Sequence, residues 1–273
     1  MAFTLGVLTD EISEDLQEAI DIAKSWGIDH IELHSAWGAN VCDLSDADLS
    51  RALRIVRGSE VTVTVIDALT LRCSLDNDDE YAQHMRHMRR SIEIAPLFDA
   101  SIVRLFSFWK EDEMTDEKWE RVFEKLELPI RIAEAEGVTI GFENVSSGNI
   151  GTSQDLERLF GHFDSPALKL IWDPGNALAA GDDRSAADGY AAVRDHVVNV
   201  HVKDAGFIDG KRHWLPIGAG DVDYLELFLA LAEDEYDGVV ALETHYRPES
   251  GSRIEGSRES LEGLRAVIAE ATS

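Results

Sequence analysis

The sequence predicts an α/β protein, a single (β/α)8 TIM barrel that spans residues 1–273. Short apolar runs alternate with longer amphipathic runs from end to end and make eight βα units with nothing left over. Right-handed crossovers between parallel strands favour a closed barrel over an open sheet. An open doubly wound sheet would want a glycine-rich phosphate turn after its first strand, where this chain has Thr9, Asp10 and Glu11.

The N-terminal half supplies four of these units. Ser13 is a plausible N-cap for the first helix, and Pro129 interrupts the fourth helix at a predicted kink. The strands are predicted at 3–8, 28–34, 61–67 and 101–107, and the helices that follow them at 13–26, 45–57, 78–97 and 116–136.

The C-terminal half repeats the pattern four times. Gly137 ends the fourth helix and the next strand starts directly after it. The strands are predicted at 138–143, 167–173, 197–203 and 238–243, and the helices at 153–162, 185–196, 224–235 and 257–271.

Alternation within these strands indicates which side chains face the barrel interior. One face of strand 197–203 is valine at every second position, whereas the other face carries Asn199, His201 and Lys203. The apolar face must pack on the helices, so the polar face points inward. The neighbouring strands share this pattern and end in Glu143, Asp173 and Glu243, at the rim where barrel active sites lie.

These side chains predict a metal site. Glu143, Asp173, His201 and Glu243 are separated by about one βα unit each, so the fold brings them together on four successive strands. Three bare carboxylates at one point would repel one another, and a divalent cation removes that repulsion. Oxygen ligands with one nitrogen suit Mn²⁺, Mg²⁺ or Co²⁺, with Zn²⁺ as a further candidate.

At this point the chain resembles the sugar phosphate isomerase/epimerase family, which has the xylose isomerase-like TIM-barrel fold. The resemblance spans nearly the whole chain and rests on GFEN (141–144), WDPGN (172–176), NVHVKD (199–204), PIGAGDVD (216–223) and LETHY (242–246). It implies that the four residues above are the metal ligands. It also implies that Glu143 and Glu243 form the acid/base pair, as in epimerases of this type.

The resemblance implies a divalent-metal-dependent isomerase or epimerase of a sugar or sugar derivative. One glutamate would take a proton beside a carbonyl and the other would return it, through a metal-stabilised enediolate. An alternative is a lyase, such as a dehydratase of a keto-inositol, which shares the enediolate but loses a hydroxyl. A more remote alternative is a non-catalytic sugar-binding barrel.

Two departures from the family narrow the activity. Ketose 3-epimerases usually have a histidine three residues after the metal aspartate and an arginine six residues after the metal histidine, where this chain has Asn176 and Phe207. The ketohexose 3-epimerase activity of those enzymes is therefore not assigned to this chain. The three-zinc apurinic endonucleases of the superfamily need further histidines on the third and fourth strands. Those strands end here in Asp67 and Ser107, so the three-zinc site is incomplete and that activity is not expected.

Six residues are predicted to contact the substrate. Lys203 lies in the inward phase beside His201, and Glu32 and His34 share one face of the second strand. Glu32 has a second predicted role, which is to orient a ligand. Trp214 sits in a long connection that is a candidate lid, and a sugar face packs well on indole. The complete set is Lys203, Asn176, Glu32, His34, His245 and Trp214, and Arg247 is a further candidate for an anionic substituent.

Composition restricts the partners and the compartment. Acidic residues outnumber basic ones by 53 to 25, and the net charge of −28 disfavours nucleic acid as a partner. No apolar run is long enough to span a membrane, and the N-terminus lacks a basic signal-peptide region. Cys42 and Cys73 have no metal-type spacing, which favours a reducing cytoplasm. The sequence leaves oligomerisation open and predicts a small carbohydrate as the partner.

The diffuse acidity predicts a salt-adapted, halophilic protein. Lowering the salt from molar concentration to about 0.1 M lengthens the Debye length from about 3 Å to about 10 Å, so the surface acids repel one another more strongly. We expect the melting temperature to fall over this range, measured by circular dichroism in KCl. Full stability in dilute buffer would contradict salt adaptation.

Overall fold

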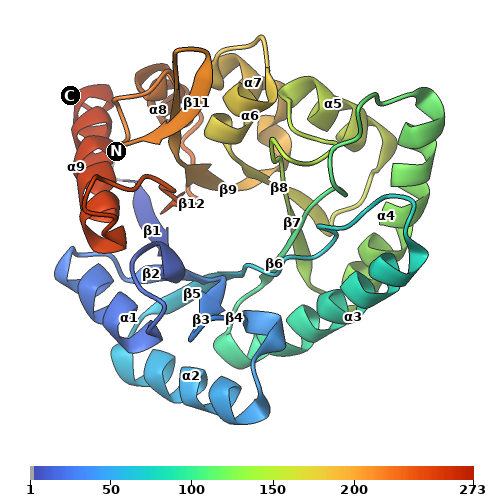
Figure 1. The fold of residues 1–273 in the computed structure, drawn as a ribbon, viewed down its shortest axis with the longest axis horizontal. Coiled ribbons are helices and arrows are strands. Elements are labelled where there is room, and N and C mark those ends of the chain that lie inside the picture. The colour runs from blue at the N-terminus through green and yellow to red at the C-terminus, as the bar shows by residue number, and fades with distance from the viewer. Residues whose placement is uncertain (1–2) are drawn as a thin grey trace.

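Eight parallel strands form a closed barrel in the computed structural model, which describes residues 3–273 (Figure 1). The barrel order is β1-β12-β9-β8-β7-β6-β5-β2. This confirms the predicted (β/α)8 fold. The strands are β1 (Thr4–Leu8), β2 (His30–Leu33), β5 (Thr62–Ile66), β6 (Ile102–Leu105), β7 (Thr139–Glu143), β8 (Leu168–Trp172), β9 (Val197–Val202) and β12 (Val239–Leu242).

Pairing between the first and last strands closes the ring. Val7 of β1 is in register with Leu242 of β12, and Ala241 of β12 is in register with His201 of β9. Because the strands are all parallel in this ring, their carboxyl ends meet at one rim. Residues more than a hundred positions apart in the sequence are thereby brought to the same opening.

An outer layer of helices surrounds the strands (Figure 1). Two of the predicted helices, 116–136 and 153–162, have the same bounds in the structure, and Gly137 ends the first of them with a φ of 68°. Ser13 is not the N-cap of α1, because Asp15 accepts the amides of Gln17 and Glu18 instead. The layer consists of α1 (Leu16–Ser25), α2 (Asp46–Ser59), α3 (Asp78–Ile94), α4 (Asp116–Glu136), α5 (Ser153–His162), α7 (Ala186–Val193), α8 (Tyr224–Glu233) and α9 (Arg253–Ala271).

Three small elements at the carboxyl rim were not predicted. The hairpin β10–β11 (Asp204–Ile208, Lys211–Leu215) fills the expected lid segment, and β3–β4 (Ser35–Ala36, Ala39–Asn40) is a minimal hairpin after β2. Helix α6 (Pro174–Ala180) directly follows β8. With 7 residues, this helix is too short to show a helical period in the sequence. Its start is defined by the proline at its first position and by the Asp173 cap.

The predicted inward and outward faces are observed. Val200, Val202 and Leu242 are fully buried in the apolar layer between strands and helices. The opposite face of the same strands turns polar side chains into the barrel, where Asn199 donates to Glu32 at 2.7 Å. The barrel therefore has an apolar jacket and, toward its carboxyl end, a polar interior.

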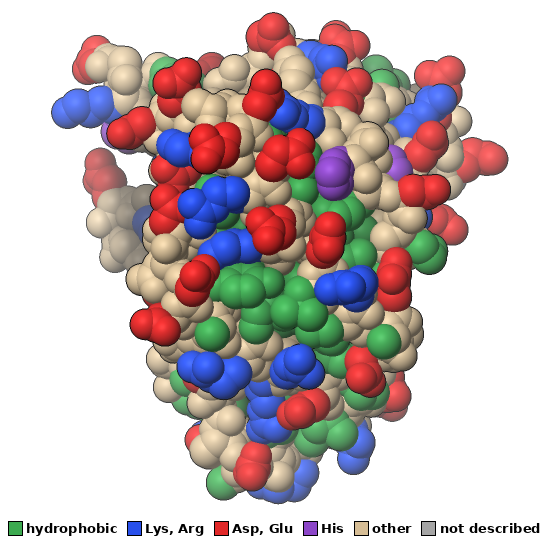
Figure 2. Space-filling model, turned by 90° about the vertical axis from the view of Figure 1, so that its right-hand side faces the viewer, with side chains coloured by type: hydrophobic (Ala, Val, Ile, Leu, Met, Phe, Trp, Pro, Cys, Tyr) green, Lys and Arg blue, Asp and Glu red, His purple; other side chains and the backbone are tan. Residues whose placement is uncertain are grey.

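Acidic side chains do not gather in one patch on the face of the molecule that Figure 2 shows. On the face shown in Figure 2, Asp and Glu side chains alternate with Lys and Arg side chains around a small apolar area. Within residues 3–273, no helix is long and apolar enough to cross a membrane. Salt adaptation and a cytoplasmic location stay predictions from the sequence.

The contact between α6 and β9 gives a test of how tightly the rim is built. A Cβ atom added to Gly175 would lie 2.2 Å from the backbone oxygen of Lys203. We expect G175A to destabilise the fold by about 1–3 kcal/mol or more, because backbone cannot move aside as a side chain can. At about 2–4 °C per kcal/mol, the melting temperature should fall by several degrees.

The matched control is G161A in α5, where nothing lies within 4 Å of the added atom. This change should leave stability unchanged or raise it by up to about 1 kcal/mol, since Ala is the better helix former. Equal melting temperatures for the two variants would show that the close approach at Gly175 is unimportant.

Candidate metal centre

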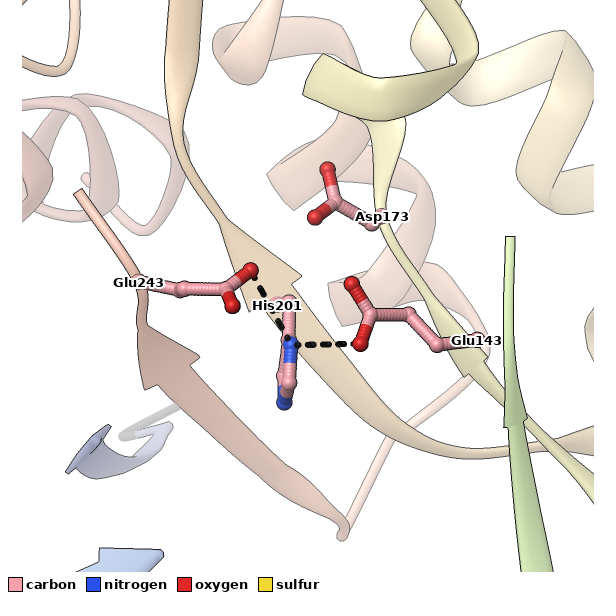
Figure 3. A group of neighbouring side chains, drawn as sticks. All are labelled: Glu143, Asp173, His201 and Glu243. Carbon is pink, nitrogen blue, oxygen red and sulfur yellow. Dashed lines mark ion pairs between the residues drawn. The ribbon is translucent and has the colours of Figure 1, made fainter. Parts of the chain in front are cut away.

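Four side chains from four adjacent strands converge at the carboxyl rim. Glu143 ends β7, Asp173 follows β8, His201 lies in β9 and Glu243 follows β12. One possible ligand atom of each lies within 4.8 Å of those of the other three, and all four side chains are buried. Figure 3 shows the three carboxylates turned toward one another around the imidazole of His201. The structure thus brings together the four predicted ligands.

The imidazole of His201 is anchored from below. Its Nε2 atom lies 2.9 Å from Oε2 of Glu32, and Glu32 is held in turn by Asn199. Its Nδ1 atom faces Glu143 at 3.7 Å and Glu243 at 3.5 Å (Figure 3) but, within the described chain, is buried without a hydrogen-bond partner. A metal-ligating histidine characteristically uses one ring nitrogen for the metal and the other for a carboxylate behind it.

Two buried cations hold the carboxylates in place. The Lys203 ammonium lies 2.7 Å from Oδ2 of Asp173 and also contacts Glu243. The Arg104 guanidinium lies 2.9 Å from Glu143 and 3.5 Å from Glu243, and its Nε atom lies 3.1 Å from Asp67. Each carboxylate of the site therefore touches at least one positive charge.

These charges and burial shift the pKa values of the three carboxyl groups in opposite directions. Burial and the Glu243 charge oppose ionisation of Glu143, but Arg104 and His201 outweigh them and bring its pKa to about 2. Burial likewise opposes ionisation of Glu243, yet Lys203 and His245 hold its pKa well below the usual value. For Asp173, burial outweighs Lys203 and raises the pKa to about 6. The two glutamates are therefore ionised at neutral pH, and Asp173, which is mostly ionised there, is the first of the three to be protonated as the pH falls.

The charge count fits a divalent cation. Burial raises the pKa of Asp67 well above its usual value, so four of the five buried acids of this interior are ionised, and with His201 neutral they face two buried cations. The two negative charges in excess equal the charge of one divalent ion, and the neutral imidazole offers its unpartnered Nδ1 atom as a ligand. The acids are Glu32, Asp67, Glu143, Asp173 and Glu243, and the basic residues are Arg104, Lys203 and His201.

Asparagines fix the geometry of Asp173. Asn144 donates to the Asp173 backbone oxygen at 2.8 Å and accepts its amide at 2.9 Å. Asn176 donates its amide side chain to Asp173 at 3.0 Å and to Glu143 at 3.2 Å. Both asparagines belong to the motifs that carry the family resemblance, and their hydrogen bonds give each of them a structural role beside Asp173.

A cavity of about 410 Å³ opens at the rim and is lined by two of the four predicted ligands, Glu143 and Glu243. This volume suits a monosaccharide-sized ligand. A groove of about 450 Å³ between α1 and α2 holds none of the predicted site residues. The cavity is lined by Leu8, Asp10, Glu11, His34, Leu69, Arg72, Arg104, Phe106, Glu143, Val145, Ser146, Ser147, Asn176, Lys203, Arg212, Trp214, Glu243 and His245.

Five of the six predicted substrate-contacting residues line this cavity: Asn176, Lys203, His34, His245 and Trp214. His34 pairs with Asp10 at 3.1 Å and His245 pairs with Glu11 at 2.6 Å, so both histidines have a partner at the mouth. Glu32 does not line the cavity. It is fully buried below His201 and contacts the imidazole. This position fits the second predicted role of Glu32, to orient a ligand, and not direct contact with substrate.

Sequence reasoning missed the arginines of the site. The inward direction of Arg104 is ambiguous in the sequence because Phe106 shares its phase, and both residues line the cavity. Arg72 and Arg212 lie in a loop and a hairpin, where no period indicates direction. Arg247, the predicted anion-binding candidate, instead forms an ion pair with Glu11 at 3.0 Å. A loop arginine near a predicted rim was the only signal available.

Curated relatives align with only part of the chain. An inosose dehydratase of Lacticaseibacillus casei is 22% identical over 176 residues, which are 59% of this chain and 58% of that protein. The chain spans little more than half the length of the curated relatives it matches. These likenesses are distant, and the named activity belongs to the relative.

Solved structures match over nearly the full length. The IOLI protein with a bound zinc atom superposes with a TM-score of 0.82 at 18% identity, covering 98% of this chain and 99% of that one. The 3-keto-D-glucoside 4-epimerase of E. coli gives 0.77 at 18% identity, covering 97% and 100%. At such identities the likeness shows the fold. Residues 20–267 match the xylose isomerase-like TIM barrel family, whose members include epimerases and dehydratases, and the chain belongs to that family.

Proposed function

We propose that this protein is a divalent-metal-dependent isomerase or epimerase of a sugar or sugar derivative. The observation that carries the proposal is the pair of ionised glutamates, Glu143 and Glu243, on either side of the free Nδ1 atom of His201 (Figure 3). Proton exchange at a carbon beside a carbonyl needs a base on one face and a proton donor on the other. Two opposed carboxylates at the floor of a sugar-sized cavity can fill these roles, one as the base and the other as the donor once it has taken a proton from Lys203 or from solvent.

The residues of the chain divide the work. Glu143 is held ionised by Arg104 and is ready to accept a proton. Glu243 touches the Lys203 ammonium and is the member of the pair that delivers a proton, with Lys203 and solvent in the cavity as its nearest sources. A divalent ion held by the four predicted ligands would supply Lewis acidity at the substrate's oxygens. Its identity among Mn²⁺, Mg²⁺, Co²⁺ and Zn²⁺ stays open.

A lyase is the second candidate function, and the match to inosose dehydratases favours it. The first step is the same removal of a proton beside the carbonyl. The second glutamate would then give its proton to a departing hydroxyl, so that water leaves and a double bond forms. Both reactions use the same two carboxylates, so the site geometry alone serves either.

Proton NMR in D₂O separates the two reactions. The metal-loaded protein is incubated with a panel of ketoses, aldoses and inososes. An epimer that carries solvent deuterium at the inverted carbon indicates epimerisation, and a product lighter by one water indicates the lyase. Release of neither product from any member of the panel would count against both.

The glutamate pair predicts a specific variant effect. E143Q keeps the size of the side chain but removes its basicity, so turnover should fall by about 10²- to 10⁴-fold. Bound metal, measured by inductively coupled plasma mass spectrometry, should be retained, because an amide oxygen and three ligands remain. The matched control is E124Q, at an exposed position of α4, which should leave turnover unchanged. Undiminished turnover in E143Q would remove Glu143 from the reaction.

The proton occupancy of the ligands predicts how metal binding depends on pH. Burial raises the pKa of Asp173 to about 6. Burial also disfavours the cationic form of His201, but the charges of Glu32 and Glu143 outweigh it and raise the pKa of His201 well above the usual value. Ligation requires ionised Asp173 and neutral His201, so binding must displace both protons at about pH 5 and only the His201 proton at about pH 7.

The apparent affinity for Mn²⁺ should therefore rise from about pH 5 to about pH 8, most steeply below pH 6. Isothermal titration calorimetry in two buffers of different ionisation enthalpy measures both the affinity and the protons released. An affinity that does not change with pH, with no proton release, would show that these two groups are not ligands.

A further inference from the structure

Two arginines enter the cavity mouth from separate elements. Arg72 lies in the loop after β5, and Arg212 lies in β11 of the hairpin. Arg72 donates to the hydroxyl of Ser147 at 3.2 Å, and Arg212 donates to the hydroxyl of Ser146 at 3.0 Å. The two guanidinium groups therefore reach adjacent serines of a single loop, the one that follows β7.

Both guanidinium groups are fixed by aromatic rings. Arg72 lies 5.0 Å from the ring centroid of Phe106 and 4.9 Å from that of Trp109. Arg212 lies 4.8 Å from the ring centroid of Trp214. Stacking of this kind holds a guanidinium plane in a defined direction and leaves its edge N–H groups available. Each arginine thus has a set orientation before any ligand arrives.

Neither arginine has an acidic partner, in contrast to its neighbours. Within residues 3–273, no carboxylate oxygen lies within 4.0 Å of the Arg72 or Arg212 guanidinium. The acidic side chains at the same mouth pair with other residues: Asp10 with His34, and Glu11 with His245 and Arg247. Positive charge therefore remains at this side of the cavity in a chain of net charge −28.

The partial burial of Arg72 makes this arrangement unfavourable without a ligand. Burial disfavours its charged form and lowers its pKa, and the distant Glu143 and Glu243 compensate only in part. A half-buried guanidinium that keeps free N–H groups is stabilised when an anion completes its hydrogen bonds. The planar fork of arginine fits a carboxylate or a phosphate in the bidentate manner.

We propose that Arg72 and Arg212, with the hydroxyls of Ser146 and Ser147, bind an anionic oxygen group on the substrate, either a carboxylate or a phosphate monoester. This inference rests on the proposed function, because it places the reacting carbon over Glu143 and Glu243 and the anionic end of the same molecule at the serine loop. The substrate is then an acidic sugar derivative and not a neutral sugar.

Direct binding tests the site without any turnover. The probes are inorganic phosphate and succinate, titrated calorimetrically into chelator-treated protein at an ionic strength of about 0.15 M, where general surface attraction is screened. We expect at least one probe to bind and the variant R72Q/R212Q to bind it at least about tenfold more weakly, since charge-assisted hydrogen bonds to both side chains are lost. Preference for one probe identifies the anion as phosphate or carboxylate.

The matched control is R131Q/R89Q, which removes the same charge from exposed positions of α4 and α3. Neither arginine forms an ion pair within residues 3–273, so the control should leave binding unchanged. Equal weakening in both double variants would assign the effect to net charge and overturn the site. Absence of binding to the wild-type protein at about 10 mM probe, or equal binding to wild type and R72Q/R212Q, would overturn it as well.

Kinetics with matched substrate pairs separates this inference from the proposed function. A ketose is compared with its terminal phosphate, and an aldose with its uronate. KM for the preferred acidic member should rise at least about tenfold in R72Q/R212Q, whereas KM for the neutral member stays unchanged. Turnover of neutral sugars only, unaffected by the variant, would reject the anion site and keep the isomerase. Probe binding without turnover of any pair would reject the isomerase and keep the site.

Discussion

The structure depends on the compensation of buried carboxylates by cations inside the barrel. Two unit charges about 4 Å apart interact with about 4 kcal/mol at an effective dielectric constant of about 20, so three carboxylates in contact would strongly oppose folding. Lys203 and Arg104 provide the opposite charge from within the same interior. Lys203 contacts Asp173 and Glu243, two of the four predicted metal ligands. The cations that compensate these carboxylates are therefore also those that a metal ion bound by the predicted ligands would have to accommodate.

Much of the fold and of the metal centre follows from the sequence because both depend on period. Alternation in β9 places His201 and Lys203 on one face, and repetition of the βα unit places Glu143, Asp173 and Glu243 on neighbouring strands. Elements without a period could not be predicted. Helix α6 has too few turns, and the hairpin β10–β11 is stabilised by the buried Asp204, which accepts the amides of Gly218, Gly220 and Val222 from outside the hairpin. The cap of α1 also needed coordinates, because Ser13 and Asp15 are both good N-cap residues.

Side-chain partners were the least predictable part of the site. Glu32 and His34 share a face of one strand in the sequence, yet Glu32 reaches His201 below the cavity while His34 turns to Asp10 at the mouth. Arg247 is an anion-binding candidate by its position in the sequence, but its guanidinium pairs with Glu11 at 3.0 Å. Which partner a side chain contacts depends on distances across the barrel. Glu32 and His201, for example, are more than 160 positions apart in the sequence. A pattern within one strand contains no information about them.

The residue Asp173 links the fold to the chemistry. It follows β8, caps α6 by accepting the amide of Asn176, and presents its other oxygen to Lys203 among the predicted metal ligands. Because one carboxylate oxygen is used for the helix and the other for the cation, the side chain cannot rotate without losing one of the two. Gly175 then has to be small, since α6 starts directly against the backbone of Lys203. Four residues of the WDPGN segment are therefore explained one by one: Asp for the cap and the contact with Lys203, Pro for the first turn, Gly for the approach to β9, and Asn to tie Asp173 to Glu143.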